Sequence, residues 1–438
     1  MVALELSNIR LAPYWHDQLT EMPPLAEHLP ATVDVLIVGS GYTGLNAAIV
    51  TARAGRSTLV LDAQDIGFGC STRNGGQIST SVKPSLAALT AKFGADRARA
   101  IRETGVEALD WLTGFVASEG LDCDFRRVGR FHAAHTPAQY ESLARDSERM
   151  RREEAIESFT VPRSEQRTEL GTDAYFGGVV FPKHSSVHPA KMHREMLRLA
   201  LAAGAQAMGQ CVVTGIEKQA QGFTVHTAKG QVQARDVIVA TNGYTGGLVP
   251  WLQRRVIPIG SYIIVTEELP QAVVDELFPK DRIASDTCKV VYYYRATPDR
   301  RRIAFGGRVL ARESDALSSA PLLYQHMCRI FPSLEGCGLS HAWGGTVAYT
   351  FDEMAHTGMH DGIHYAMGYC GSGVSMAGFL GMRLGQKLLG LAEGRTAFDG
   401  LAHPTRPFYT GRPWFLPAAV AYYRWKDNRE WAGAEAAA

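Results

Sequence analysis

The sequence predicts an α/β protein with one domain around a parallel sheet and a second domain around a mostly antiparallel sheet. A strand, glycine loop, helix and strand over residues 35–62, and a second glycine loop before a helix near residue 371, predict the first domain. β-branched and aromatic runs over residues 250–345 predict the second sheet. With 438 residues, the chain is long enough for two or three domain-sized cores.

Three glycines organise the first unit. The apolar run 35–38 leads into a GxGxxG loop formed by Gly39, Gly41 and Gly44, and a helical pattern follows. In a dinucleotide-binding βαβ unit, the first glycine turns the strand sharply, the second lets the backbone approach a pyrophosphate, and the third lets helix and strand pack closely. This pattern is typical of a Rossmann-type domain.

The rest of the unit fits the same interpretation. Tyr42 and Thr43 lie in the glycine loop, and the helix-like segment 45–54 that follows offers unpaired N–H groups at its start, which can bind phosphate. The second apolar run, 58–61, ends in Asp62. An acid at this position can accept a hydrogen bond from a ribose 2′-OH, and Ala63 follows it. A glycine-rich turn in an ordinary βαβ unit is the alternative, but the order of strand, glycines, helix, strand and acid favours dinucleotide binding.

Composition excludes several classes of function. The chain has 45 basic and 44 acidic residues and a net charge of +1, which gives no electrostatic case for nucleic acid or an anionic membrane as partner. No apolar run approaches the length of a membrane-spanning helix, and the N-terminal residues lack a signal-peptide core. Seven cysteines without a CxxC pattern indicate reduced thiols in a cytoplasmic protein and no metal site.

Three further loops extend the predicted dinucleotide site. The loop after Asp62 is rich in glycine and polar residues and can wrap the pyrophosphate and reach the ring end of a cofactor; a plain surface loop is the alternative. The strand 237–240 returns the chain to the first domain, and the strand 363–367 precedes a helix over about 374–393, whose dipole would stabilise negative charge on a nearby ring. The candidate residues of these loops are Gly69, Ser71, Arg73, Asn74, Gly75, Gly76 and Gln77, then Ala240, Thr241 and Gly243, then Gly371, Ser372, Gly373 and Val374.

The predicted second sheet offers aromatic and cationic side chains. Tyr262 lies in one strand pattern, and the run 292–295 (Tyr-Tyr-Tyr-Arg) lies in another. Because side chains alternate along a strand, only about half of these can face a ligand. Arg126, Arg127 and Arg130 fit a surface position better than a ligand site, and His188 fits the start of a helix at Pro189 better than a catalytic base.

The whole pattern resembles the FAD-dependent D-amino-acid oxidase (DAO) superfamily, and within it bacterial γ-glutamylputrescine oxidase-like enzymes. Four blocks carry the resemblance in the order of that family: VGSGYTGLNAA, DIGFGCSTRNGGQ, VIVATNGYT and GYCGSGVSMAG, with WGGTVAYTFDEMAHTG before the last. The resemblance implies FAD rather than NAD, held by the loop residues named above, with the backbone near Val213 beside adenine. It also implies a discontinuous FAD-binding domain over 33–84, 161–250 and 340–401.

The remaining boundaries follow from that assignment. The substrate domain is expected over 85–160 and 251–339, an N-terminal arm on the surface over 1–32, and a C-terminal tail over 402–438. Two positions depart from relatives. Ser372 stands where many relatives have histidine, and Val347 stands where monomeric sarcosine oxidases have a flavin-linking cysteine, so we expect non-covalent FAD; a covalent link through Cys370 is disfavoured.

The resemblance implies oxidation of an amine or amino-acid C–N bond by hydride transfer to flavin N5, with hydrolysis of the imine. Oxygen or another electron acceptor would reoxidise the flavin, and the oligomeric state stays open. Aromatic side chains could cage the amine and Arg295 could pair with a carboxylate, although packing is an alternative for every candidate. The candidates are Tyr262, Tyr294, Arg295, His341, Trp343 and Tyr349.

Two other functions remain as alternatives. An NAD(P)H-dependent flavin monooxygenase would need a nicotinamide site, and the sequence has no second complete dinucleotide pattern. An FAD subunit of an amine dehydrogenase complex is disfavoured by the full-length second domain. Oxidase and dehydrogenase activities are not distinguished by the sequence.

Overall fold

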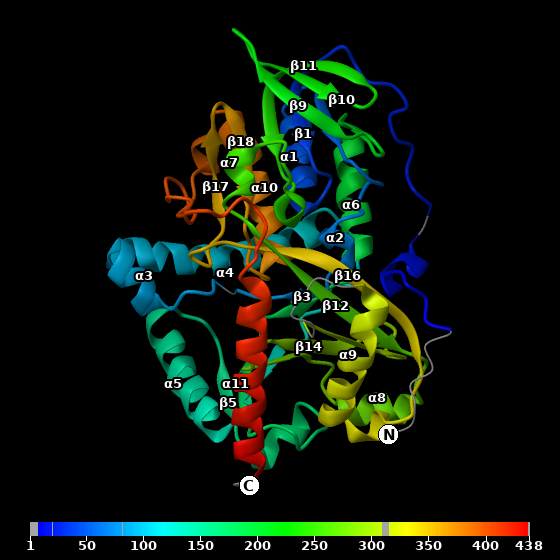
Figure 1. The fold of residues 1–438 in the computed structure, drawn as a ribbon, viewed down its shortest axis with the longest axis vertical. Helices are drawn as coiled ribbons and strands as arrows, with labels where there is room; N and C mark the ends of the chain where they lie inside the picture. The colour runs from blue at the N-terminus through cyan, green and yellow to red at the C-terminus, as the bar shows by residue number, and fades with distance from the viewer. Residues whose placement is uncertain (1–7, 20, 81, 309–314, 437–438) are drawn as a thin grey trace.

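A computed structural model describes residues 8–19, 21–80, 82–308 and 315–436. Within these residues the strands form two eight-stranded sheets and one two-stranded sheet. One large sheet lies in the upper half of Figure 1 and the other in the lower half, with helices α2 and α4 between them. The α/β class with a second, mostly antiparallel sheet is confirmed.

The first sheet has the predicted parallel centre. β1 pairs in parallel with β11 on one side and with β2 on the other, and β11 pairs in parallel with β18. The chain therefore returns to this sheet twice, as expected. In order across the sheet the strands are β17 (His356–His360), β18 (Ile363–Met367), β11 (Gly230–Val239), β1 (Thr32–Val38), β2 (Thr58–Leu61) and β8 (Gln206–Met208), with β10 (Phe223–Thr227) and β9 (Val213–Lys218) joined through β11.

Two helices pack closely at the centre of this domain. α1 (Tyr42–Arg53) follows β1, and α10 (Gly373–Leu388) follows β18. Glycines on α10 permit the contact, because a Cβ on Gly381 would lie 2.3 Å from the Thr43 carbonyl oxygen. The other helices near this sheet are α2 (Cys70–Arg73), α6 (Pro189–Ala202) and α7 (Pro250–Gln253), with the short 3-10 helices η3 (Asn242–Tyr244) and η5 (Ala392–Gly394). The 3-10 helix η2 (Arg163–Thr168) lies with the second sheet.

The second sheet is antiparallel apart from one pair, β13 with β4. One of its faces packs on α9 (Ala316–Ile330), and the core there includes Phe131, Tyr294 and Phe305. Its strands, in order, are β16 (Leu339–Tyr349), β12 (Ile257–Thr266), β15 (Ile303–Gly307), β14 (Tyr292–Ala296), β13 (Ile283–Asp286), β4 (Arg130–Ala133), β6 (Gly178–Phe181) and β5 (Phe159–Val161). Helix α8 (Gln271–Leu277), η4 (Pro332–Leu334) and the small sheet of β3 (Gln77–Ile78) and β7 (Ser185–Ser186) complete this half.

Several segments lie outside the domain to which the sequence assigned them. β6 and β16 belong to the second sheet, although 161–250 and 340–401 were expected in the FAD-binding domain. Helices α3 (Leu86–Phe93) and α4 (Ala95–Ser118), expected in the substrate domain, place Leu89 and Leu112 in the core of the first domain. Sheet membership depends on pairing between distant segments, which local patterns do not encode. Helix α5 (Pro137–Glu153) stays with the second sheet, beside β5 and β6.

One part of the N-terminal arm is buried, while residues 21–32 are exposed or half-buried. The short helix η1 (Tyr14–Gln18) contacts α6 and α2, and Trp15 is fully buried. The expectation of a surface arm was wrong for η1, because Tyr14 and Trp15 supply large apolar surfaces that pack against Trp343 and Ile263.

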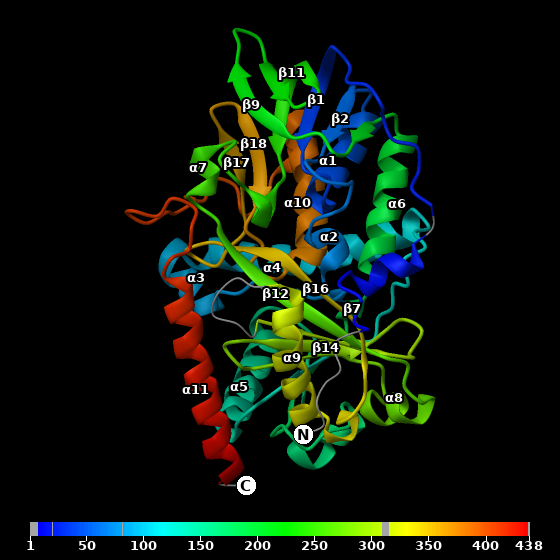
Figure 2. The same ribbon diagram turned by 45° about the vertical axis from the view of Figure 1, so that its right-hand side comes forward.

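The C-terminal tail forms a helix, α11 (Leu416–Ala436), which lies along the outside of the second domain (Figure 2). Trp431 joins the second-sheet core, and the Asp427 carboxylate accepts hydrogen bonds from the N–H groups of Lys289 and Val290 at 3.0 and 2.9 Å. Among the described residues, none of the helices combines the length and apolar character needed to cross a membrane.

Candidate functional site

The glycine loop after β1 is built on close backbone contacts. Gly39 has a φ of +107°, and a Cβ there would lie 2.8 Å from the Ala240 carbonyl oxygen. A Cβ on Gly44 would lie only 2.0 Å from the Gly39 carbonyl oxygen, so α1 starts directly against the loop. Both glycines are therefore required by geometry, as their positions in the pattern predicted.

The N-terminus of α1 is open to an anion. Its N-cap, Gly41, provides no side-chain cap, and the first turn holds no acidic residue. The Tyr42 N–H donates to the Ser71 hydroxyl oxygen at 2.9 Å, and a Cβ on Gly41 would lie 2.9 Å from that same oxygen. Positive helix dipole, free N–H groups and a small residue at the cap form a cradle suited to a pyrophosphate.

Asp62 lies at the carboxyl end of β2, beside this cradle. Its Oδ2 accepts hydrogen bonds from the Ser40 N–H at 3.0 Å and the Ser40 hydroxyl at 2.6 Å, and its Oδ1 accepts from the Gln64 N–H at 3.1 Å. A carboxylate has about four acceptor positions, so one remains for a ribose hydroxyl. Ala63 is exposed next to it. The Cys211 N–H donates to the Asp62 carbonyl, which brings the start of β9 at Val213 to the same edge.

The loop from Gly69 to Gln77 is fastened from both sides. Two indoles donate to consecutive carbonyl groups: Trp343 to Arg73 at 2.8 Å and Trp15 to Asn74 at 2.9 Å. The Asn74 side chain accepts from the Gly76 N–H and donates to the Cys70 and Ser71 carbonyls. These contacts fix the loop, which begins with the short helix α2 at its N-cap Gly69.

The end of this loop presses against β14 of the second sheet. A Cβ on Gly75 would lie 2.9 Å from the ring of Tyr293, and one on Gly76 would lie 2.8 Å from Nη1 of Arg295. The Gln77 side-chain amide donates to the carbonyls of Ala284 and Tyr294, each at 3.1 Å. The loop therefore joins the two domains.

The two later loops converge on the same place. The Asn242 side-chain oxygen accepts from the Gly368 N–H at 2.9 Å, which links the loop after β11 to the loop after β18. The Thr43 and Tyr369 hydroxyls lie 2.6 Å apart, which links that second loop to α1. A Cβ on Gly243 would lie 2.4 Å from the Thr346 carbonyl oxygen on β16. Ala240 and Thr241 lead into these contacts from β11.

The N-terminus of α10 is the second open helix start. Its N-cap, Ser372, makes no side-chain cap, and the first turn has no acidic residue. Gly373 and Val374 begin the helix, and a Cβ on Gly371 would lie 3.6 Å from the Tyr349 hydroxyl. Two uncapped helix starts and the acid at the end of β2 make a donor and acceptor set that fits FAD. The pyrophosphate would lie at α1, the ribose at Asp62 and the flavin near α10.

Two of the six candidate catalytic residues have structural roles in the fold. Tyr294 is buried in the second core, stacks on Phe305 and donates its hydroxyl hydrogen to Tyr175, so it faces away from the FAD-binding loops. Arg295 directs three of its N–H donors to the carbonyls of Gly76, Val187 and Ala296, and burial lowers its pKa to about 10. It supports the loop.

Tyr293 was not among the candidate residues predicted from the sequence, yet it is the tyrosine of this run that faces the loop. Its hydroxyl lies 2.9 Å from that of Ser261, and its ring covers Gly306, where a Cβ would lie 2.4 Å from ring carbons. Strand alternation already placed Tyr293 and Arg295 on one face and Tyr294 on the other. The glycine at 306, opposite Tyr293, was the sequence signal for a ring lying over that position.

The remaining candidates are spread along the sheet. His341, Trp343 and Tyr349 share one face of β16, but His341 lies 3.0 Å from an Asp17 carboxylate oxygen in the arm, far from Tyr349 at the α10 loop. Eight residues along a strand span about 26 Å. Tyr262 packs in the second core with Tyr294. Of these four, Trp343 and Tyr349 lie against the FAD-binding loops.

A buried histidine supports the glycine loop and predicts acid sensitivity. His193 Nε2 lies 2.7 Å from the Ser40 carbonyl oxygen, and burial lowers the pKa of His193 to about 4. Because this folded-state pKa is below the unfolded value of about 6.5, the stabilisation is complete above pH 6.5 and is lost as the pH falls towards 4. Between pH 7 and pH 5 the free energy of unfolding should fall, and we expect His193 to account for about 2 kcal/mol of that fall.

The measurement is urea unfolding at pH 7 and pH 5. His193→Gln keeps a hydrogen-bond donor but cannot gain charge, so its stability should fall less at pH 5 than that of the unchanged protein. The exposed His28 provides the control, His28→Gln, whose pH dependence should match the unchanged protein. An equal loss of stability between pH 7 and pH 5 in His193→Gln and in the unchanged protein would show that His193 does not contribute to the acid sensitivity.

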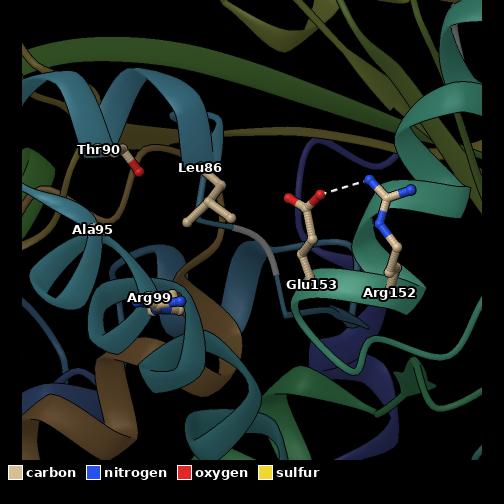
Figure 3. A pocket seen from close by; sticks show the side chains of 6 residues that line it. All are labelled: Leu86, Thr90, Ala95, Arg99, Arg152 and Glu153. Carbon is tan, nitrogen blue, oxygen red and sulfur yellow. Dashed lines mark hydrogen bonds and ion pairs between the residues drawn. The ribbon is translucent and has the colours of Figure 1, made fainter.

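A surface hollow lies elsewhere, between α3, the start of α4 and the end of α5 (Figure 3). Arg152 and Glu153 form an ion pair at 2.7 Å on one side of it. None of the candidate residues lines it, so it is separate from the glycine loops. The lining residues are Leu86, Thr90, Ala95, Arg99, Arg152 and Glu153.

The fold and the site define a two-domain flavoprotein whose FAD-binding loops lie against a second sheet. A family profile described as FAD dependent oxidoreductase (DAO) matches residues 34–387. The chain belongs to this family and is an FAD-dependent oxidoreductase.

Individual relatives agree with the family. The chain is 33% identical over 405 residues to gamma-glutamylputrescine oxidoreductase of Escherichia coli, covering 91% of this chain and 93% of the relative. It is 27% identical to the probable oxidoreductase OrdL of Haemophilus influenzae, covering 93% and 94%. Glycine oxidase from Geobacillus kaustophilus has a similar fold, with a TM-score of 0.72 at 17% identity, covering 86% of this chain and 99% of that one.

Proposed function

We propose that this enzyme oxidises the C–N bond of an amine or amino acid at the interface between its two domains. The observation that carries the proposal is the fastening of two FAD-binding loops to one face of the second sheet. Gly75 packs on Tyr293 there, and Cys370 donates its N–H to the Ala348 carbonyl at 2.9 Å. This face is the natural wall for a substrate beside the flavin.

When bound, FAD would supply the two-electron acceptor at N5 for the hydride of the carbon next to nitrogen, and water would hydrolyse the resulting imine. The protein contributes orientation and exclusion of water. Tyr293 and Tyr349 are half-buried and present aromatic surface on the wall, which suits a neutral or cationic amine, whereas Trp343 is buried against Trp15 and holds the loop. Val347 stands where a linking cysteine would be, which supports non-covalent FAD.

The similarity to gamma-glutamylputrescine oxidoreductase supports γ-glutamylputrescine or a related acylated diamine as the substrate. The similarity in fold to glycine oxidase keeps amino acids in the panel. Oxygen and other electron acceptors are both compatible with the site.

The experiment is anaerobic mixing of the holoenzyme with a panel of amines, amino acids and NADPH, followed by flavin absorbance. We expect an amine or amino acid to bleach the flavin and NADPH to leave it oxidised. Bleaching by NADPH alone would overturn the proposal in favour of a monooxygenase. Release of hydrogen peroxide on admitting air then separates an oxidase from a dehydrogenase.

Paired tyrosine variants test which face of β14 serves the site. We expect Tyr293→Ala, which removes the ring against Gly75, to lower kcat/KM about tenfold, or about 1.4 kcal/mol, and to alter the flavin absorbance spectrum. Tyr294→Phe removes only a core hydrogen bond, so it should cost about 1 kcal/mol of stability with kcat/KM unchanged. The reverse pattern would contradict the proposed wall.

A further inference from the structure

A buried polar cluster lies on the same face of the second sheet as Tyr293. Arg130 Nε donates to the Ser285 hydroxyl oxygen at 2.8 Å, and His132 Nδ1 lies 2.9 Å from that oxygen. His184 Nε2 lies 3.2 Å from the Thr80 hydroxyl, and Arg130 and His132 both influence the pKa of His184. These five residues, from β4, β13, the segment after β3 and the turn after β6, are the Arg130 cluster.

The cluster carries a positive charge without a direct ion-pair partner among the described residues, although the buried Asp286, next to Ser285 on β13, acts on Arg130 from a longer distance. Within the part of the chain that the structure describes, no carboxylate lies within ion-pair distance of Arg130, and Ser285 takes its Nε and one Nη2 hydrogen bond. Burial lowers the pKa of Arg130 to about 10 and that of His132 to about 3, so at neutral pH the arginine is charged and the imidazole neutral. Charged groups are rarely buried without a partner.

The cluster is partly accessible and has an unused polar atom. Arg130 and His132 each keep part of their surface uncovered. His184 is 3% exposed, and its Nδ1 has no hydrogen-bond partner among the described residues. A buried polar atom without a partner beside a partly accessible charge suits a polar ligand.

The sheet register places the Arg130 cluster next to the proposed substrate wall. His132 pairs with Ser285, and Ser285 pairs with Tyr293, so the three lie in one row across adjacent strands. His132 and Tyr293 are therefore separated by two strand spacings, about 10 Å. On the other side, the Ser79 carbonyl, one residue before Thr80, accepts a hydrogen bond from Ser375 in the first turn of α10.

We propose that Arg130, oriented by Ser285, binds the carboxylate of the amine substrate. This inference rests on the proposed function and adds the acidic end of the substrate to it. Nη1 of Arg130 has no hydrogen-bond partner among the described residues, so its N–H groups can donate charge-assisted hydrogen bonds to a carboxylate, and the positive charge repels the ammonium end. The carboxylate lies either on the oxidised carbon or at the far end of a longer amine, and substrate pairs distinguish these.

This assignment replaces the one expected for Arg295. Three N–H donors of Arg295 hold the main-chain carbonyls of Gly76, Val187 and Ala296. Among the described residues, Arg130 donates to the Ser285 hydroxyl and also lies near His132. The sequence favoured a surface position for Arg130, but β4 lies inside the second sheet between β13 and β6.

The first test uses the unchanged holoenzyme and a carboxylate that cannot be oxidised at nitrogen. Pentanoate should perturb the visible absorbance of the bound flavin in a saturable way, and the uncharged pentanamide should bind at least tenfold more weakly. This measurement does not depend on turnover or on a variant that folds. Equal binding of pentanoate and pentanamide would overturn the inference.

The second test compares Arg130→Gln with Arg127→Gln, a neighbouring exposed arginine, in anaerobic flavin reduction. One substrate pair is γ-glutamylputrescine and N-(4-aminobutanoyl)putrescine, which lacks only the remote carboxylate; the other is norvaline and butylamine, which lacks the α-carboxylate. Arg130→Gln should raise the half-saturating concentration of the carboxylate member about tenfold to a hundredfold, the loss of one charged hydrogen bond, and that of its partner less than threefold. Arg127→Gln should change neither.

The outcomes separate the two proposals. If no amine bleaches the flavin, the proposed function fails, while the pentanoate titration still reports on Arg130. If amines bleach the flavin but Arg130→Gln affects both members of a pair equally, the carboxylate inference fails alone. A third outcome would also overturn the inference. In it, Arg130→Gln loses FAD while Arg130→Lys keeps it, and pentanoate binds no tighter than pentanamide. The charge of Arg130 would then serve to bind the cofactor.

Discussion

Gly44→Ala should raise the Kd for FAD at least a hundredfold, about 3 kcal/mol. The added methyl group would lie 2.0 Å from the Gly39 carbonyl oxygen and 3.2 Å from the Gly39 carbonyl carbon, and both atoms belong to the backbone. No side-chain rotation relieves this clash, so the start of α1 must move away from β1. The N–H groups at the helix start then no longer converge on the pyrophosphate.

Titration of apoprotein with FAD, followed by quenching of flavin fluorescence, measures the effect. Gly114→Ala is the matched control, because Gly114 lies within α4 and a Cβ there would meet nothing within 4 Å. Alanine at a helix interior should stabilise α4 by about 1 kcal/mol and leave the Kd for FAD unchanged. Wild-type FAD affinity in folded Gly44→Ala would refute the role assigned to the α1 start.

Elements encoded by local patterns were predictable. β2 spans Thr58–Leu61 and β18 spans Ile363–Met367, as the apolar runs bounded by glycine and charge predicted. The glycine positions 39, 41 and 44 also followed from the sequence, because each is demanded by a contact within one short unit. The family resemblance then supplied FAD.

Features that depend on distant partners were not predictable. The pairing of β4 with β13 joins Phe131 to Ala284, about 150 residues apart along the chain, so nothing near Arg130 indicates that its strand is internal. The choice of Tyr294 over Tyr293 failed for a related reason. Alternation gives two faces, and the core face is decided by packing on Phe305 in the adjacent strand and by Tyr175, which is 119 residues away along the chain.

The arm shows how composition can mislead. Prolines near Tyr14 and Trp15 argue correctly against a long helix, but they do not decide whether the segment is exposed. Trp15 lies against Trp343 and His188, with ring centroids 6.0 and 5.3 Å away, and its N–H reaches the Asn74 carbonyl. Adjacent aromatic residues in an irregular segment were the available signal for burial.

Trp15→Ala should therefore lower the free energy of unfolding by about 3–5 kcal/mol, the usual loss for a large buried aromatic residue. It should also weaken FAD binding about tenfold, since the Asn74 carbonyl loses its indole donor next to Gly75. Trp15→Phe keeps an aromatic ring but lacks the N–H, so we expect it to recover much of the stability and little of the FAD affinity. Urea unfolding and FAD titration measure the two effects separately.

The control is Trp414→Ala, because Trp414 is 74% exposed and its removal should change stability by less than about 0.5 kcal/mol. If Trp15→Ala behaved like Trp414→Ala, the arm would be an appendage. If Trp15→Ala lost stability but kept full FAD affinity, the arm would belong to the core without positioning the loop. The indoles of Trp15 and Trp343 donate to the consecutive carbonyls of Asn74 and Arg73, so we expect Trp15→Ala to lower both the stability and the FAD affinity.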